Sequence, residues 1–112
     1  MLTFFNANAT HIMGGEITWE CIKDPTDPNV GLYIFKMKIY RDCDGTTLST
    51  FSQTLDVWNH PSVTQITVDW VITTDISPNC DVTNSGNAAL DCISNPVGAV
   101  EEYIYESQPI AL

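Results

Sequence analysis

Two aspartates flank a cysteine in the segment Asp42-Cys43-Asp44-Gly45. Carboxylates this close together are ligands that Ca²⁺ prefers. An EF-hand loop, however, also needs a glutamate at its twelfth position, where this chain has Gln53. The segment therefore does not match an EF-hand. A looser calcium site is one hypothesis, and the alternative is that the two carboxylates cap a tight turn through local hydrogen bonds. The candidate ligands are Asp42, Asp44, Asp81 and Asp91.

The four cysteines suggest disulfide chemistry, because an even number of cysteines in an exported chain usually forms disulfides. Cys21 and Cys43 are expected at opposite ends of a hairpin, about 33 Å apart at the usual rise per residue. A disulfide needs Cα atoms about 4.4–6.8 Å apart, so this pair is disfavoured. Two alternatives stay open: Cys80–Cys92, or a bond from Cys43 to either of them. Cys21 is then expected to be buried or paired with a cysteine beyond Leu112.

The other chemically capable residues do not assemble an enzyme site. Zinc would require a close cysteine pair, which the sequence lacks. His11 and His60 stand far apart beside turn-forming residues, which is typical of surface histidines. Glu101 and Glu102 are neighbours on an expected strand and face opposite sides, so they cannot act on one glycosidic bond. No nucleophile elbow or phosphate loop is present. We therefore expect no enzyme, and no cofactor apart from the calcium hypothesis.

Three tryptophans are the remaining candidates for ligand contact. Trp19, Trp58 and Trp70 fit core positions at least as well as a sugar-binding platform. Trp58 alone lies next to a turn, which makes it the candidate for exposed stacking on a ligand.

Charge excludes two classes of partner. The chain has 112 residues and a formal charge of −10. Such an acidic chain repels the phosphate backbone of nucleic acids and anionic membrane surfaces. No apolar run approaches the length of a membrane span, so no membrane insertion is expected. Hydrophobic residues make up 44% of the chain, enough for the core of one domain.

Alternation of apolar and polar residues predicts the elements that would position these residues. The fold class is expected to be all-β: an antiparallel, immunoglobulin-like β-sandwich of strands joined as a meander. The sandwich would be incomplete if the chain is the front part of a longer protein. A long polar stretch, residues 75–98, is expected to be functional or to be held in place by bonds to the rest of the domain. The expected strands are residues 16–22, 32–41, 48–58, 63–74 and 100–106. The residues expected to share a face are Tyr33, Phe35, Met37 and Ile39 on the second strand, Ile66, Val68, Trp70 and Ile72 on the fourth, and Tyr103 and Tyr105 on the last.

The first residues look like the end of an export signal, with a short apolar run followed by Ala7-Asn8-Ala9, a small-x-small cleavage pattern. Residues 1–9 are therefore expected to be a signal-peptide remnant, and residues 10–112 the β-sandwich domain. An open sheet of five strands would leave bare edges. Either the last residues pair back onto the sheet, or the domain is the front part of a longer protein, and we expect the second.

Four motifs occur in order along the chain: His-Ile-Met-Gly-Gly-Glu-Ile-Thr-Trp, Ile-Tyr-Arg-Asp-Cys-Asp-Gly, Ile-Ser-Pro-Asn-Cys and Val-Glu-Glu-Tyr-Ile-Tyr-Glu-Ser. Together they resemble the amino-terminal region of large secreted surface proteins of Bacteroidetes, which are exported by type IX secretion and are gliding-motility-associated or adhesin-like. The resemblance implies a secreted or cell-surface protein on the outer-membrane exterior of a Gram-negative bacterium.

The function implied by this resemblance is a non-enzymatic module with a structural or adhesive role. Its partners would be cell-surface or extracellular ligands, such as glycans or other envelope proteins, and residues 75–98 would be the contact surface. The alternative function is a carbohydrate-binding module that uses Trp58 and nearby polar residues.

Overall fold

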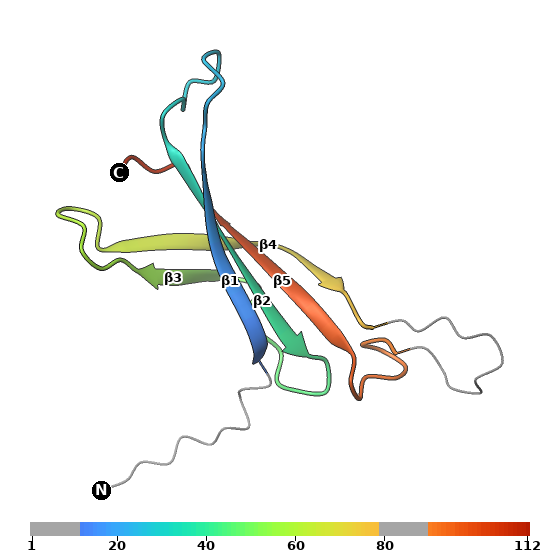
Figure 1. Ribbon diagram of the computed structural model, residues 1–112. Coiled ribbons are helices and arrows are strands. Elements are labelled where there is room, and N and C mark those ends of the chain that lie inside the picture. The colour runs from blue at the N-terminus through green and yellow to red at the C-terminus, as the bar shows by residue number, and fades with distance from the viewer. Residues whose placement is uncertain (1–11, 79–89) are drawn as a thin grey trace, which may run out of the picture.

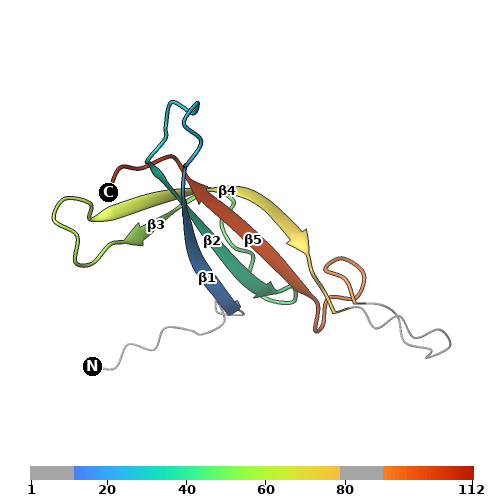
Figure 2. The same cartoon turned by 45° about the horizontal axis from the view of Figure 1, so that its top comes forward.

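The computed structural model describes residues 12–78 and 90–112 of the chain. Five antiparallel strands form one sheet in the order β1-β2-β5-β4-β3 (Figure 1). The strands are β1 (Ile12–Cys21), β2 (Tyr33–Asp42), β3 (Ser52–Asp56), β4 (Gln65–Asp75) and β5 (Val100–Ser107). In Figures 1 and 2 the β3–β4 hairpin runs across the direction of β1, β2 and β5, as expected for a strongly twisted sheet.

One face of the sheet, which we call the core face, carries the hydrophobic core. Side chains alternate between the faces of a strand, and the register places Tyr105 of β5 opposite Met37 of β2. The opposite face is mostly polar, and on it Lys36 and Lys38 of β2 form ion pairs with glutamates of β1. The buried core residues are Met37, Ile66, Val68, Tyr103 and Tyr105.

The connection between β2 and β3 covers part of the core face. Leu48 packs against the core, and the buried Tyr105 hydroxyl donates a 2.5 Å hydrogen bond to the Ser49 carbonyl. Towards β1 the same face is open. Ile17 and Trp19 are 52% and 65% exposed. The core is therefore covered over β2, β5 and β4 but bare at the β1 edge.

The all-β antiparallel prediction is confirmed, whereas the meander is wrong and the sandwich is not confirmed. All strands of the described residues lie in one sheet, because β5 inserts between β2 and β4. β5 is suited to the centre, since Tyr103 and Tyr105 are 4% and 0% exposed there. The β2–β3 connection crosses the core face instead of forming a tight hairpin. This crossing also shortens β3 to Ser52–Asp56, against the predicted 48–58.

A register shift in β4 corrects a second prediction. The sequence placed Ile66, Val68, Trp70 and Ile72 on one face, but the pairing with β5 shifts between Trp70 and Ile72. A bulge puts one extra residue into the strand and reverses the alternation after it. Ile72 therefore pairs with Ile104, whose side chain belongs to the opposite face.

Candidate functional site

A groove of about 300 Å³ lies at the open side of the core face. Its volume is at the lower end of the range of small-ligand pockets, about 300–1,000 Å³. Three parts of the chain meet there: the paired strands β1 and β2, the β3–β4 hairpin with its turn, and the residues after β5. The lining residues are Trp19, Phe35, Val57, Trp58, Asn59, His60, Ile66 and Leu112.

The β3–β4 turn holds Trp58 out from the sheet. The Val57 amide donates a 2.8 Å hydrogen bond to the Thr64 carbonyl, which closes the turn. Asn59 has φ 65°, a left-handed conformation that asparagine tolerates better than most residues. The Trp58 side chain is 85% exposed as a result. A role for Trp58 in ligand stacking stays a prediction, but the ring is available for it.

His60 is more constrained than the sequence suggested. Its Nδ1 accepts hydrogen bonds from the backbone amides of Val63 at 2.9 Å and Ser62 at 3.2 Å. Nδ1 therefore acts as the acceptor, and the neutral ring carries its proton on Nε2. His60 is half-buried and lines the groove, whereas we had expected a surface histidine without a partner.

Trp19 and Phe35 are directly paired between β1 and β2 and form the opposite wall. By sequence, Trp19 fits a core position at least as well as a sugar-binding platform. It does lie on the core face, but no second layer among the described residues covers it. Two indole rings with Asn59 and His60 beside them provide flat apolar surfaces and a few hydrogen-bonding groups. Such surfaces suit the binding of rings or alkyl groups.

At the other end of β2 the structure joins Cys43 to Cys92, with Cα atoms 5.1 Å apart. This is one of the pairings that the sequence left open, and it is incompatible with a Cys80–Cys92 bond. Cys80 itself lies outside the described residues. Cys21 is half-buried and unbonded in the part of the chain that the structure describes. It lies at the opposite end of the β1–β2 pair, as strand geometry predicted.

A buried ion pair lies beside this disulfide. The Arg41 Nε donates a 2.6 Å hydrogen bond to Glu101 Oε1, Nη2 contacts the same oxygen, and Nη1 donates to the Gly45 carbonyl at 2.7 Å. Arg41 is 4% exposed. The partner of Arg41 thus comes from β5, far along the chain.

The calcium candidates Asp42 and Asp91 accept hydrogen bonds within their own turns. Asp42 Oδ1 accepts from the Asp44 amide at 3.0 Å. Asp91 Oδ1 accepts from the amides of Ile93 and Ser94, both at 2.7 Å. The Ser94 hydroxyl is the main cause of a lowered pKa at Asp91. Local turn capping is thus present, and Asp81 lies outside the described residues. Calcium binding stays a prediction.

One group of metal-ligand types does come together among the described residues. Ligand atoms of Cys43, Cys92 and Glu101 lie within 4.8 Å of one another. Two of them are bonded in the disulfide, and Glu101 is paired with the Arg41 guanidinium. In the oxidised protein the three residues therefore act as structural cross-links, two through the disulfide and one through the ion pair.

Hydrogen bonds hold the described ends of the polar stretch 75–98 in place. Asp75 accepts hydrogen bonds from the amides of Ser77 and Cys92, each at 3.0 Å. The Ser77 hydroxyl, followed by these amides, lowers the pKa of Asp75. The expectation that this stretch forms the contact surface falls largely on residues 79–89, which lie outside the described residues.

Comparisons with protein-family models, curated proteins and solved structures found no match to this chain. Among the described residues, no helix is long and apolar enough to cross a membrane.

Proposed function

We propose that this chain is a non-enzymatic binding module of the cell surface, with an adhesive or structural role. The observation that carries the proposal is the open part of the core face, where Trp19 and Trp58 are 65% and 85% exposed. Exposed large aromatics gathered on one apolar surface are typical of interaction sites.

Compartment and chemistry support this proposal. A disulfide between Cys43 and Cys92 is compatible with an oxidising exterior. The groove contains one titratable side chain, His60, and general acid–base catalysis would need a matched partner within reach. Binding is thus better supported than catalysis. Attachment to a Gram-negative surface through type IX secretion rests on the sequence resemblance.

A carbohydrate-binding module is the second candidate. The specific observation in its favour is the Trp58 ring with Asn59 and His60 as its neighbours on the turn. Sugar rings stack their apolar faces on aromatic rings while their hydroxyls bond to polar groups nearby.

The test uses groove variants in the full chain. Trp58→Ala and Trp19→Ala should each reduce binding of the purified protein to bacterial cells and immobilised envelope extract by about tenfold or more. Phe51→Ala is the matched control, since Phe51 is 80% exposed but does not line the groove. Equal binding by all three variants and the parent would refute the groove as the contact surface.

A glycan array separates the two candidates. Array binding that Trp58→Ala abolishes would identify a carbohydrate ligand. A blank array together with cell binding that depends on Trp58 would point to a protein ligand and remove the carbohydrate candidate.

A further inference from the structure

The outer edge of β1 is bare in the part of the chain that the structure describes, because β1 is an end strand of the sheet. It is 10 residues long, and nine of its positions are exposed while Cys21 is half-buried. The other edge strand, β3, has 5 residues. A long unpaired edge is a template for pairing with another strand.

The hydrogen-bonding groups on this edge can be assigned. The Ile22 amide donates to the Leu32 carbonyl at 2.9 Å, so Ile22 faces β2. Orientation alternates along an antiparallel strand. The even-numbered residues of β1 therefore bond to β2, and the amides and carbonyls of the odd-numbered residues point outward. These residues are Gly15, Ile17, Trp19 and Cys21.

Proline and lysine, two of the usual protections of an edge strand, are missing from β1. The one register shift lies near its start, between Ile12 and Gly14, and leaves the rest of the edge regular. Its charges are Glu16 and Glu20, on the face opposite the core. They pair with lysines of β2, Glu16 with Lys38 at 3.7 Å and Glu20 with Lys36 at 3.5 Å.

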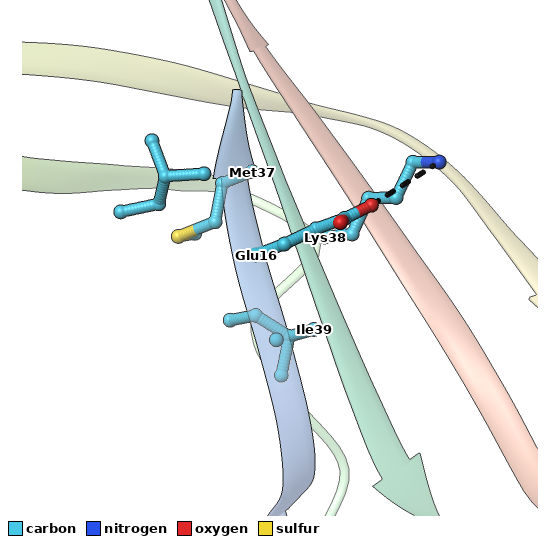
Figure 3. A pocket seen from close by; sticks show the side chains of 6 residues that line it. Glu16, Met37, Lys38 and Ile39 are labelled. Carbon is cyan, nitrogen blue, oxygen red and sulfur yellow. Dashed lines mark ion pairs between the residues drawn. The ribbon is translucent and has the colours of Figure 1, made fainter.

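Figure 3 shows the two faces at this point, with the Glu16–Lys38 ion pair directed away from Met37 and Ile39. Both charges lie on the polar face, so the core-face side of the edge is uncharged there. A partner strand can therefore approach β1 without meeting an unpaired charge on the apolar side.

We propose that a second copy of this chain pairs antiparallel along β1, so that the two sheets join into one. In this arrangement Ile17 lies opposite Ile17 of the second copy. The pairing uses the outward groups of odd-numbered residues on both strands, as the hydrogen-bond alternation requires.

Charge selects this register among the neighbouring ones. Moving the centre of the pairing from Ile17 to Glu16 places Glu16 opposite Glu16 of the second copy, and moving it to Thr18 places Glu16 opposite Glu20. Like charges directly opposite are unfavourable. With Ile17 at the centre, Glu16 instead faces Thr18, and Glu20 faces Gly14. The next registers that avoid opposed glutamates centre on Gly15 and on Trp19, and both pair a shorter part of β1.

The central register also suits the side chains. Trp19 lies opposite Gly15 of the second copy, on the core face. A large aromatic ring beside a strand glycine shields its bare backbone, a pairing known to stabilise sheets. The exposed Ile17 and Trp19 side chains of both copies would then form one continuous apolar strip.

The net charge of the chain opposes this association, and it therefore predicts how the dimer should respond to salt. Each copy carries −10, so two copies repel at long range, and salt screens that repulsion. Pairing through backbone and apolar groups should therefore tighten as salt is raised, unlike an association held by opposite charges.

The test is sedimentation velocity over about 1 µM to about 1 mM protein. It uses a thiol-free buffer and the Cys21→Ser variant as the parent protein. We expect reversible dimers, and a larger dimer fraction when NaCl is added. Thr18→Glu places like charges opposite in two pairs and should weaken the dimer about tenfold. Within one copy it faces Lys36, so folding should be retained. Thr18→Ser is the matched control.

Ile17→Pro gives a second test, since it removes an outward amide that β2 does not use. It should abolish the dimer while the far-ultraviolet circular dichroism spectrum stays that of the parent. A monomer over the whole concentration range, or a dimer that both variants leave unchanged, would overturn the proposal.

Discussion

Arg41 of β2 lies directly opposite Glu101 of β5, and their ion pair is buried beside the Cys43–Cys92 bond. Because Arg41 also donates to the Gly45 carbonyl, one side chain connects the centre of the sheet with the turn that follows β2. The covalent link and the ion pair thus fix the same end of the sheet, opposite the groove.

Replacing Arg41 with Met should be strongly destabilising. It leaves the Glu101 carboxylate buried without its partner, and breaking such a pair typically costs about 3–5 kcal/mol. Urea unfolding followed by fluorescence measures the loss. Glu101→Gln, which keeps the shape and an acceptor oxygen, should cost less. An Arg41→Met variant as stable as the parent would show that the pair contributes little.

Removing the disulfide should lower the free energy of unfolding. With a sequence separation of 49 residues, the chain-entropy relation gives about 4 kcal/mol. We expect Cys43→Ser and Cys92→Ser to show this loss in denaturant, while Cys21→Ser has a small effect. Peptide mapping under non-reducing conditions checks the pairing itself. Recovery of a Cys80–Cys92 peptide would contradict the structure.

Acid should weaken the fold partly through Asp75. Hydrogen bonds from the Ser77 hydroxyl and from backbone amides lower its pKa below 3.8 in the folded state. Because the pKa of Asp75 is lower in the folded protein than in the unfolded chain, its ionised carboxylate stabilises the fold at pH values above the unfolded pKa of about 3.8. This stabilisation is lost as the pH falls from about 3.8 through the pKa of the folded state. Thermal melts between about pH 7 and pH 2 should show a smaller acid loss in Ser77→Ala. An identical pH profile in both proteins would argue against this role.

Two adjacent glycines of β1 should respond differently to alanine. A Cβ at Gly15 would lie 2.8 Å from the Lys38 carbonyl oxygen, whereas one at Gly14 meets nothing within 4 Å. Because the contact is with backbone, Gly15→Ala should cost about 1–3 kcal/mol, and Gly14→Ala is the matched control. Equal melting temperatures for the two variants would contradict the close approach of β1 to β2.

The sequence predicted the strands better than their arrangement. Alternation correctly placed Tyr33, Phe35, Met37 and Ile39 on one face, and Tyr103 with Tyr105, since side-chain period is a local property. The insertion of β5 between β2 and β4 depends on contacts far apart in the chain, such as Arg41 with Glu101. No local sequence pattern predicts these long-range contacts. The bulge before Ile72 is likewise set by pairing with β5.

The candidate site was predicted only in part. Trp58 next to a turn was a local signal, and the ring is exposed as that signal suggested. Trp19 and Phe35 carry the alternation of core residues, so the sequence could not show that their side of the face is open. His60 joins the groove because its ring is held by two amides of the following turn. The dipeptide His-Pro was a sign of that turn, but not of the groove.

The Cys43–Cys92 bond closes residues 43–92, with β3 and β4 among them, into a single covalent ring. A protease that cuts the chain once anywhere inside this ring releases no fragment, because both halves stay tied through the two sulfurs. Such a clipped protein would migrate as one species on a non-reducing gel and separate into two after thiol treatment. The bond thus keeps the protein in one covalent piece after a single cut between Cys43 and Cys92.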